Sequence, residues 1–167
     1  MNSLLVTYIL QTEKWTSPEL FETKNRIYTF LNPVSYLIAL ENKSLFEQFD
    51  GIFADGSLLV SAIRLVYGKR VTRRSFDMTS LAPELLNYLM ESRKTLYIVA
   101  SGQEQVECSV RIFQEQYPKL RIAGFRNGYF SSDAEMNKEA SHIVELNPDF
   151  LIVGMGALMQ EKFLLKV

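Results

Sequence analysis

An apolar run near the end of the printed sequence constrains the fold more than any other segment. Residues 148–156 (PDFLIVGMG) are dominated by apolar side chains, stop at Gly154 and Gly156, and lead into the polar residues Gln160 and Glu161. A continuous apolar strand is typical of a parallel sheet that helices cover on both faces. In such open sheets, ligands bind outside the carboxyl ends of the strands. The run therefore predicts a buried strand that delivers a ligand-binding loop between Gly154 and Glu161.

Other strand-like and helix-like patterns alternate along the chain. Strand patterns cover residues 27–31, 51–54, 95–100 and 120–124. Helix patterns cover residues 33–49, 57–67, 77–92, 103–117 and 132–146, and a further helix starts near residue 17. Capping residues mark three of these helix starts, namely Ser17, Asn32 and Ser132. The alternation predicts an α/β fold with a mainly parallel, doubly wound (Rossmann-like) sheet and helices on both faces. Because no linker or repeat interrupts it, residues 1–167 are expected to form a single domain.

The composition excludes several classes of protein. With 47% hydrophobic and 22% charged residues over 167 positions, the chain has enough apolar side chains for a globular core. A formal net charge of -1 gives no global attraction to nucleic acid, so we expect no nucleic-acid partner. The longest apolar stretch, residues 150–159, is much shorter than the roughly 20 residues that span a bilayer. We therefore expect neither a transmembrane helix nor a secretory signal.

Polar residues and glycines follow four of the predicted strands. They are Asn32, Asp55, the pair Ser101-Gly102, and the segment 154–160. Since the carboxyl ends of parallel strands meet at one edge of a sheet, these positions are expected to converge on one site. Asp55 precedes Gly56, and an Asp-Gly pair is also typical of a simple turn, so spacing alone leaves both interpretations open. A carboxylate that follows a buried strand is nevertheless a candidate general base.

Residues 57–76 form a cationic segment without a single acidic residue before Asp77. The basic residues in it are Arg64, Lys69, Arg70, Arg73 and Arg74. One interpretation is a solvated loop after a helix. The other is contact with a diphosphate group or an anionic membrane surface, because guanidinium groups bind phosphate through paired hydrogen bonds. The surrounding aromatic residues are too few for a nucleic-acid surface.

Sequence motifs for common cofactors and metals are missing. Gly154 and Gly156 lack the third glycine of a dinucleotide fingerprint, since Met159 stands at that position. There is also no P-loop and no Asp-x-Asp motif, so we expect neither a cofactor nor a metal. His142 falls inside a predicted helix without a nucleophile motif and is expected to be structural or exposed. Cys108 is expected to be an ordinary helix-surface residue and cannot form an internal disulfide.

Several short motifs follow one another in a specific order between residues 27 and 163. They are Asn32-Pro33, Phe53-Ala54-Asp55-Gly56, Ser75-Phe76-Asp77-Met78, Tyr97-Ile98-Val99-Ala100-Ser101-Gly102, Tyr117-Pro118 with Gly124, Gly128-Tyr129-Phe130, Asn147-Pro148-Asp149, and Gly154-Met155-Gly156 with Gln160-Glu161-Lys162. Each motif is modest on its own. As an ordered set, they resemble the WecG/TagA/CpsF glycosyltransferases.

This resemblance implies a bacterial enzyme of envelope or capsular polysaccharide synthesis, bound peripherally to the inner, cytoplasmic face of the cell membrane. It implies inverting transfer of an N-acetylmannosamine-type sugar from a UDP donor to N-acetylglucosamine on an undecaprenyl diphosphate carrier. Family members continue with a membrane-docking C-terminal segment, which we expect to be absent here. The alternative is a noncatalytic nucleotide-sugar-binding or scaffold domain left by truncation.

The resemblance also implies roles for individual residues. Asp55 would be the general base that deprotonates the acceptor hydroxyl, and Arg73 and Arg74 would face diphosphate. Backbone N–H groups near Gly154 and Gly156 would stabilise the UDP leaving group as charge develops on it. The other expected substrate-binding residues are Asn32, Gly56, Ser101, Gly102, Gly128, Tyr129, Gln160 and Glu161.

One apolar segment leaves the oligomeric state open. Residues 58–66 are mostly apolar, and we expect them to belong to the core. Pairing of subunits into a homo-oligomer, or contact with a membrane, would explain the same residues.

Overall fold

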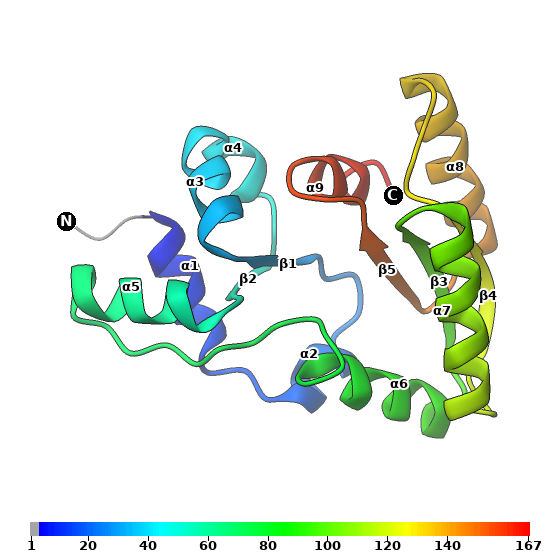
Figure 1. The fold of residues 1–167 in the computed structure, drawn as a ribbon, viewed down its shortest axis with the longest axis horizontal. Helices are drawn as coiled ribbons and strands as arrows, with labels where there is room; N and C mark the ends of the chain where they lie inside the picture. Colours follow the sequence, from blue (N-terminus) through cyan, green and yellow to red (C-terminus); the bar gives the residue numbers. More distant parts are fainter. Residues whose placement is uncertain (1–3) are drawn as a thin grey trace. The chain divides into compact units, whose positions relative to one another are not determined.

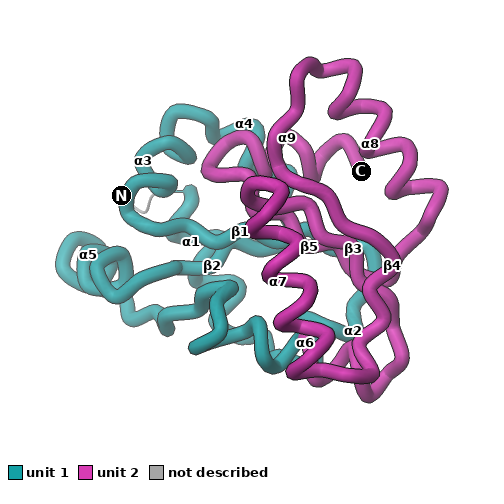
Figure 2. Tube along the Cα trace, turned by 45° about the vertical axis from the view of Figure 1, so that its right-hand side comes forward, with its two compact units in different colours: residues 1–85 teal, residues 86–167 magenta. Residues whose placement is uncertain are grey.

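The computed structural model describes residues 4–167 and divides the chain into two compact units. Unit 1 comprises residues 1–85 and unit 2 comprises residues 86–167, with the boundary inside helix α6 (Leu81–Ser92) (Figure 2). Each unit has its own parallel sheet with helices around it (Figure 1). The predicted α/β class with parallel strands is thus confirmed, and the strands are divided between two small sheets.

Unit 1 is built around a parallel pair of strands, β1 (Tyr28–Leu31) and β2 (Gly51–Ala54), in which Leu31 lies opposite Ala54. Its helices are α1 (Leu4–Thr12), α2 (Ser17–Glu22), α3 (Pro33–Glu41), α4 (Lys43–Phe46) and α5 (Ser57–Tyr67). All four residues of β2 are buried. Helix α1 packs against β2, and the Thr12 hydroxyl donates a hydrogen bond to the Ile52 carbonyl at 3.1 Å. The strand that precedes Asp55 is therefore held firmly.

Local hydrogen bonds in unit 1 shift some helix bounds away from those predicted from the sequence. The prediction that Ser17 caps α2 is wrong by one residue, because the Thr16 N–H donates to the Glu19 carboxylate at 2.7 Å and makes Thr16 the cap. The helix predicted from residue 33 to residue 49 ends at Glu41, and a separate short helix, α4, starts after Asn42. By contrast, α5 has the predicted bounds.

Helix α6 begins at Leu81, four residues later than predicted. The Asp77 carboxylate accepts hydrogen bonds from the backbone N–H and the hydroxyl of Thr79, at 2.8 and 2.7 Å. Asp and Asn side chains that bond two residues ahead stabilise a turn in place of a helix. These bonds therefore delay the helix until after Ser80.

Unit 2 contains three parallel strands in the order β4-β3-β5. They are β3 (Thr95–Ala100), β4 (Arg121–Arg126) and β5 (Phe150–Gly154), and the helices are α7 (Gln103–Gln116), α8 (Asp133–Leu146) and α9 (Met159–Leu164). The central strand β3 is the buried one. The apolar run at residues 150–154 does form a strand, but the prediction that it is buried is wrong: Leu151, Ile152 and Val153 are half-buried. In this sheet β5 is an edge strand that pairs on one side only.

The core of unit 2 joins its central strand to two helices. Tyr97 and Val99 on β3 pack with α8 and α9 residues in one buried cluster. The helix residues of that cluster are Met136, Ala140 and Ile143 from α8 and Phe163 from α9. Helix α9, which the sequence patterns did not predict, thereby anchors the loop that follows β5.

Candidate functional site

Two predicted site residues follow the paired strands of unit 1. Asn32 comes directly after β1 and Asp55 directly after β2, and the Asp55 N–H donates to the Leu31 carbonyl at 2.8 Å. The Asp55 side chain is half-buried, and within residues 4–167 its carboxylate makes no hydrogen bond or ion pair. The structure therefore places an unpaired carboxylate at the carboxyl edge of this sheet, beside Asn32.

Asn32 is exposed and also caps a helix. Its Oδ1 atom accepts the N–H groups of Val34 and Ser35, at 3.0 and 2.9 Å, and so caps α3. The predicted cap is confirmed. Capping occupies the carboxamide oxygen, so Nδ2 is the group of Asn32 that remains for an outside partner.

The two predicted diphosphate-binding arginines lie in different surroundings. The Arg74 N–H donates to the Ala54 carbonyl at 3.0 Å, which brings Arg74 alongside the end of β2. Its guanidinium lies 5.8 Å from the centroid of the Phe53 ring. Arg73 instead pairs with Asp77 at 2.6 Å. Hydrogen bonds from Thr79, with a smaller contribution from Arg73, lower the pKa of Asp77 to about 2. The Arg74–Ala54 backbone bond places Arg74 beside Ala54, the residue that precedes Asp55.

Three loops of unit 2 are bonded to one another at the carboxyl edge of its sheet. The Gly128 N–H donates to the Ser101 carbonyl at 2.8 Å, and the Ser101 N–H donates to the Gly154 carbonyl at 3.1 Å. A Cβ atom on Gly128 would lie only 3.0 Å from Met155 Cγ. Glycine at position 128 therefore allows the loops after β3, β4 and β5 to approach closely. The structure thus brings together Ser101 and Gly154, which the strand-end argument selected, and Gly128, which the family resemblance implies.

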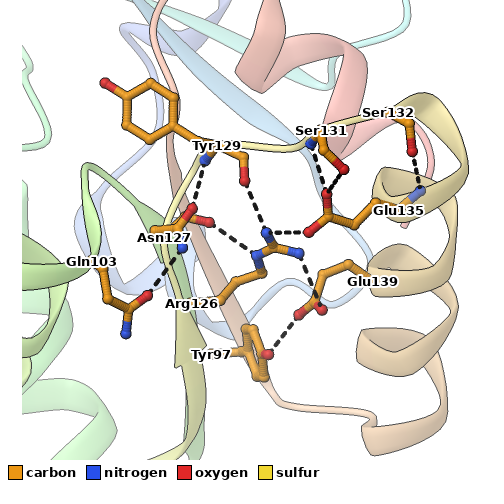
Figure 3. Close-up of polar contacts among 9 residues, drawn as sticks. All are labelled: Tyr97, Gln103, Arg126, Asn127, Tyr129, Ser131, Ser132, Glu135 and Glu139. Atoms are coloured by element: carbon orange, nitrogen blue, oxygen red, sulfur yellow. Dashed lines mark hydrogen bonds and ion pairs between the residues drawn. The ribbon is translucent and has the colours of Figure 1, made fainter.

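Arg126, a residue that the sequence argument missed, fastens the loop after β4 (Figure 3). Its Nε donates to the Asn127 carbonyl at 3.0 Å and its Nη2 to the Tyr129 carbonyl at 2.9 Å. The guanidinium also lies 3.9 Å from the centroid of the Phe130 ring. One side chain therefore holds the backbone of residues 127–130 in place.

Two glutamates of α8 hold Arg126 in turn (Figure 3). Its Nη2 donates to Glu135 at 3.1 Å, and Glu139 lies 3.6 Å from Nη1 and accepts the Tyr97 hydroxyl at 2.6 Å. Hydrogen bonds from Ser131 and then from Arg126 lower the pKa of Glu135 to about 2. Burial, followed by the bond to Glu139, raises the pKa of Tyr97. No short motif links these positions, which explains why the sequence argument did not find the network.

The loop presents one aromatic ring to solvent. Asn127 accepts the Tyr129 N–H at Oδ1 and donates from Nδ2 to Gln103, both at 3.0 Å. With the backbone held in this way, the Tyr129 side chain is 75% exposed. A fixed backbone with a free ring is an arrangement that suits stacking on a planar ligand.

The loop after β5 is shorter than predicted, because α9 begins at Met159. Gly156 has φ +87° and Leu158 has φ +73°, so the chain turns through left-handed conformations within this loop. Glu161 is fully buried, and its carboxylate accepts the Leu158 N–H at 2.7 Å and the Gln160 side-chain amide at 3.0 Å. The buried Glu161 carboxylate therefore stabilises the turn at Leu158 through hydrogen bonds.

The two remaining chemistry-bearing residues lie on helices, His142 on α8 and Cys108 on α7. His142 and Cys108 are exposed, and the His142 ring lies edge-on to Tyr97 with 6.3 Å between the centroids. Within residues 4–167, no group of three or more His, Cys, Asp or Glu side chains is arranged to hold a metal ion. None of the helices in this part of the chain is both long and apolar enough to cross a membrane.

Parallel α/β units with glycines and polar side chains at their strand ends define a class of protein that binds ligands at the sheet edge. Comparison with known families is more specific. Residues 9–167 match the description "Glycosyl transferase WecG/TagA/CpsF family", and the chain belongs to that family.

Several curated relatives are similar to this sequence over most of the chain. A UDP-Gal:alpha-D-GlcNAc-diphosphoundecaprenol beta-1,4-galactosyltransferase of Shigella boydii is 30% identical over 141 residues, 84% of this chain and 59% of the relative. An N-acetylglucosaminyldiphosphoundecaprenol N-acetyl-beta-D-mannosaminyltransferase of Bacillus subtilis is 24% identical, over 98% of this chain and 62% of the relative. A protein of the same description from Staphylococcus aureus is 25% identical over 86% of this chain and 56% of its own length. The chain thus spans about 60% of the length of these relatives.

Proposed function

We propose that the protein is an inverting, UDP-sugar-dependent glycosyltransferase of bacterial envelope or capsular polysaccharide synthesis. Its proposed acceptor is N-acetylglucosamine on undecaprenyl diphosphate, the acceptor named for both kinds of relative. The proposed donor carries an N-acetylmannosamine-type sugar, as the names of the Bacillus and Staphylococcus relatives support. The Shigella relative makes UDP-galactose the competing donor.

The single observation that carries the proposal is the unpaired Asp55 carboxylate at the end of a buried strand. A general base needs an oxygen that no other residue of the protein already occupies, and Asp55 has no hydrogen-bond or ion-pair partner within residues 4–167. Buried strand β2 on its N-terminal side and the Asp55–Leu31 backbone bond hold the backbone that carries this carboxylate. Asp55 is therefore the proposed catalytic base.

In the proposed reaction, the acceptor hydroxyl passes its proton to Asp55 while its oxygen bonds to the anomeric carbon. The bond from that carbon to the UDP oxygen breaks at the same time, so the configuration inverts and UDP leaves with the electron pair. Asn32 and Gly56 border the base, and the Arg74 guanidinium, with Arg73 further out, offsets the charge that develops on the diphosphate.

The proposed donor pocket is formed by the unit 2 loops. Ser101, Gly102, Gly128, Gly154 and Gly156 expose backbone close to the strand ends, where a ligand can approach it. Tyr129 offers an exposed ring to the base of the nucleotide. Gln160 donates to Glu161, which also accepts the Leu158 N–H of this loop, so we propose that this pair sets the shape of the pocket wall.

The proposed setting is the inner, cytoplasmic face of the cell membrane, where the protein binds peripherally to reach a lipid-linked acceptor. We also propose that residues 1–167 act together as one catalytic core domain. A homo-oligomer is compatible with this proposal but is not required by it.

The experiment is to incubate the protein separately with UDP-N-acetylmannosamine and with UDP-galactose, each with a lipid-linked N-acetylglucosaminyl diphosphate acceptor. We expect transfer from UDP-N-acetylmannosamine, detected as a larger lipid-linked product and free UDP. Transfer from UDP-galactose alone would correct the donor. Binding of UDP without turnover of any UDP sugar would reject the enzyme and support a noncatalytic nucleotide-sugar-binding domain.

A further inference from the structure

Helix α5 of unit 1 is apolar on two sides. Leu59 and Ile63 are buried at 3% and 1% exposure and attach the helix to the unit. Leu58, Leu65 and Val66 are exposed at 69%, 87% and 69%. The prediction that this segment is entirely core is therefore wrong for these three side chains, since one helix face can bury only part of a segment that is apolar throughout.

The exposed apolar residues form a continuous stripe. Leu58, Ala62, Leu65 and Val66 are spaced at i, i+4, i+7 and i+8, which places them on one side of a helix. Scattered single apolar residues on a surface are normal, but a contiguous apolar patch usually marks an interaction site. The stripe thus has the geometry of a docking surface.

Exposed cations continue the stripe at the end of the helix. Gly68, with φ +66°, ends α5 in a left-handed cap, and the exposed residues Lys69 and Arg70 follow at once. Arg64 is exposed on the same helix, and residues 57–76 contain no acidic side chain. We call Leu58, Ala62, Leu65, Val66, Lys69 and Arg70 the α5 surface.

We propose that the α5 surface docks on an anionic lipid bilayer, with the apolar stripe among the lipid chains and the cations at the phosphate level. A helix face of this composition suits a membrane interface, where basic residues add electrostatic attraction to apolar burial. In a twofold contact between two copies the same patch meets itself, and because residues 57–76 contain no acidic side chain, it offers no negative charge to pair with these cations. Anionic lipid complements this charge and a second copy does not. The proposal rests on the proposed function only in that a lipid-linked acceptor requires the protein to reach a membrane.

Vesicle binding tests the proposal without any sugar donor or acceptor, so its failure is separate from failure of the proposed activity. The protein is sedimented with vesicles of phosphatidylglycerol and phosphatidylcholine, and with vesicles of phosphatidylcholine alone. We expect binding to the anionic vesicles only. Leu65→Glu, and separately the double variant Lys69→Gln/Arg70→Gln, should each weaken that binding about tenfold or more. The matched control Val144→Glu, at a residue of α8 that is 53% exposed, should bind as the parent does.

Circular dichroism of each variant is used to check that it is folded. Absence of binding to anionic vesicles would overturn the proposal, and so would an equal loss for Leu65→Glu and Val144→Glu. Sedimentation velocity supplies the competing outcome: a dimer in the parent that Leu65→Glu dissociates, without vesicle binding, would assign the α5 surface to a second copy of this chain.

Discussion

The charged side chains near the strand ends differ in their pairing between the two units. In unit 2, Arg126 pairs with both Glu135 and Glu139 and donates to the backbone of the loop of residues 127–130 (Figure 3). In unit 1, the Asp55 carboxylate has no hydrogen-bond or ion-pair partner within residues 4–167. Groups that are bonded to each other maintain shape, whereas a free carboxylate is available to an incoming molecule. The comparison shows that unit 2 uses its charged side chains to hold a loop, whereas unit 1 leaves a carboxylate unpaired at a strand end.

Asp55→Asn should give the largest change in activity. The amide keeps the shape of the side chain but cannot accept a proton, so kcat should fall by about 10²- to 10⁴-fold. Steady-state assays of UDP release measure this change. Asp133→Asn, the same substitution at an exposed residue in the first turn of α8, should keep the parental kcat. A loss of similar size in both variants would remove the distinction between the two units.

Arg126→Ala should loosen the unit 2 loop and leave Glu139 without its cation. We expect KM for the donor to rise about tenfold with a much smaller change in kcat, and the free energy of unfolding to fall by about 2 kcal/mol. Arg126→Lys should retain only part of the parental donor affinity and stability, because lysine lacks the planar guanidinium that reaches both loop carbonyls. The control is Arg121→Ala at the start of the same strand. A fall in kcat with unchanged KM would place Arg126 in the chemical step.

Gly156→Ala tests the backbone of the loop after β5. No atom within 4 Å opposes a Cβ at this position, but φ is +87°, so the cost is conformational and should be about 1 kcal/mol of unfolding free energy. Gly102→Ala is the control, because Gly102 has φ -80° and its Cβ would meet only the flexible end of Gln105. Equal stability of the two variants in urea titrations would contradict a left-handed turn at Gly156.

The smallest expected effect is a dependence of stability on acidic pH. The pKa of Glu135 is about 2 in the folded protein and 4.5 for an ordinary glutamate, so its carboxylate stabilises the fold above pH 4.5. That contribution is lost as the pH falls from 4.5 toward 2. Glu135→Gln should flatten the fall in unfolding free energy over this window, and Glu145→Gln should not. Parallel profiles for the parent and Glu135→Gln would show that Ser131 and Arg126 do not hold this carboxylate.

Much of the fold was predictable because its elements carry local signals. Helix α5 has the predicted bounds, as do β2 and β3, since each is an apolar run with turn residues at its ends. Helix α9 was missed because its first three residues, 159–161, were interpreted as part of a ligand loop. The half-buried state of β5 was also not predictable, because sequence shows that a strand is apolar but not which strands lie beside it.

The candidate site was predictable to a similar degree. Strand-end reasoning selected Ser101 and Gly154, which the structure bonds to each other, and it selected Asp55, whose role stays a prediction; Gly128, which bonds to Ser101, came from the family resemblance. It missed Arg126, because the partners of this residue lie nine and thirteen positions away on a helix. Long-range side-chain networks leave no regular spacing for a sequence pattern to show.

The most direct test of the account is to measure UDP affinity and single-turnover rate side by side for the parent protein and for Asp55→Asn. Isothermal titration calorimetry gives the affinity, and rapid quench with the preferred UDP sugar and the lipid-linked acceptor gives the rate. We expect that Asp55→Asn binds UDP within about threefold of the parent and has lost nearly all transfer. A transfer rate equal to that of the parent would contradict the assignment of Asp55 as the catalytic base. So would a variant that loses both UDP binding and transfer.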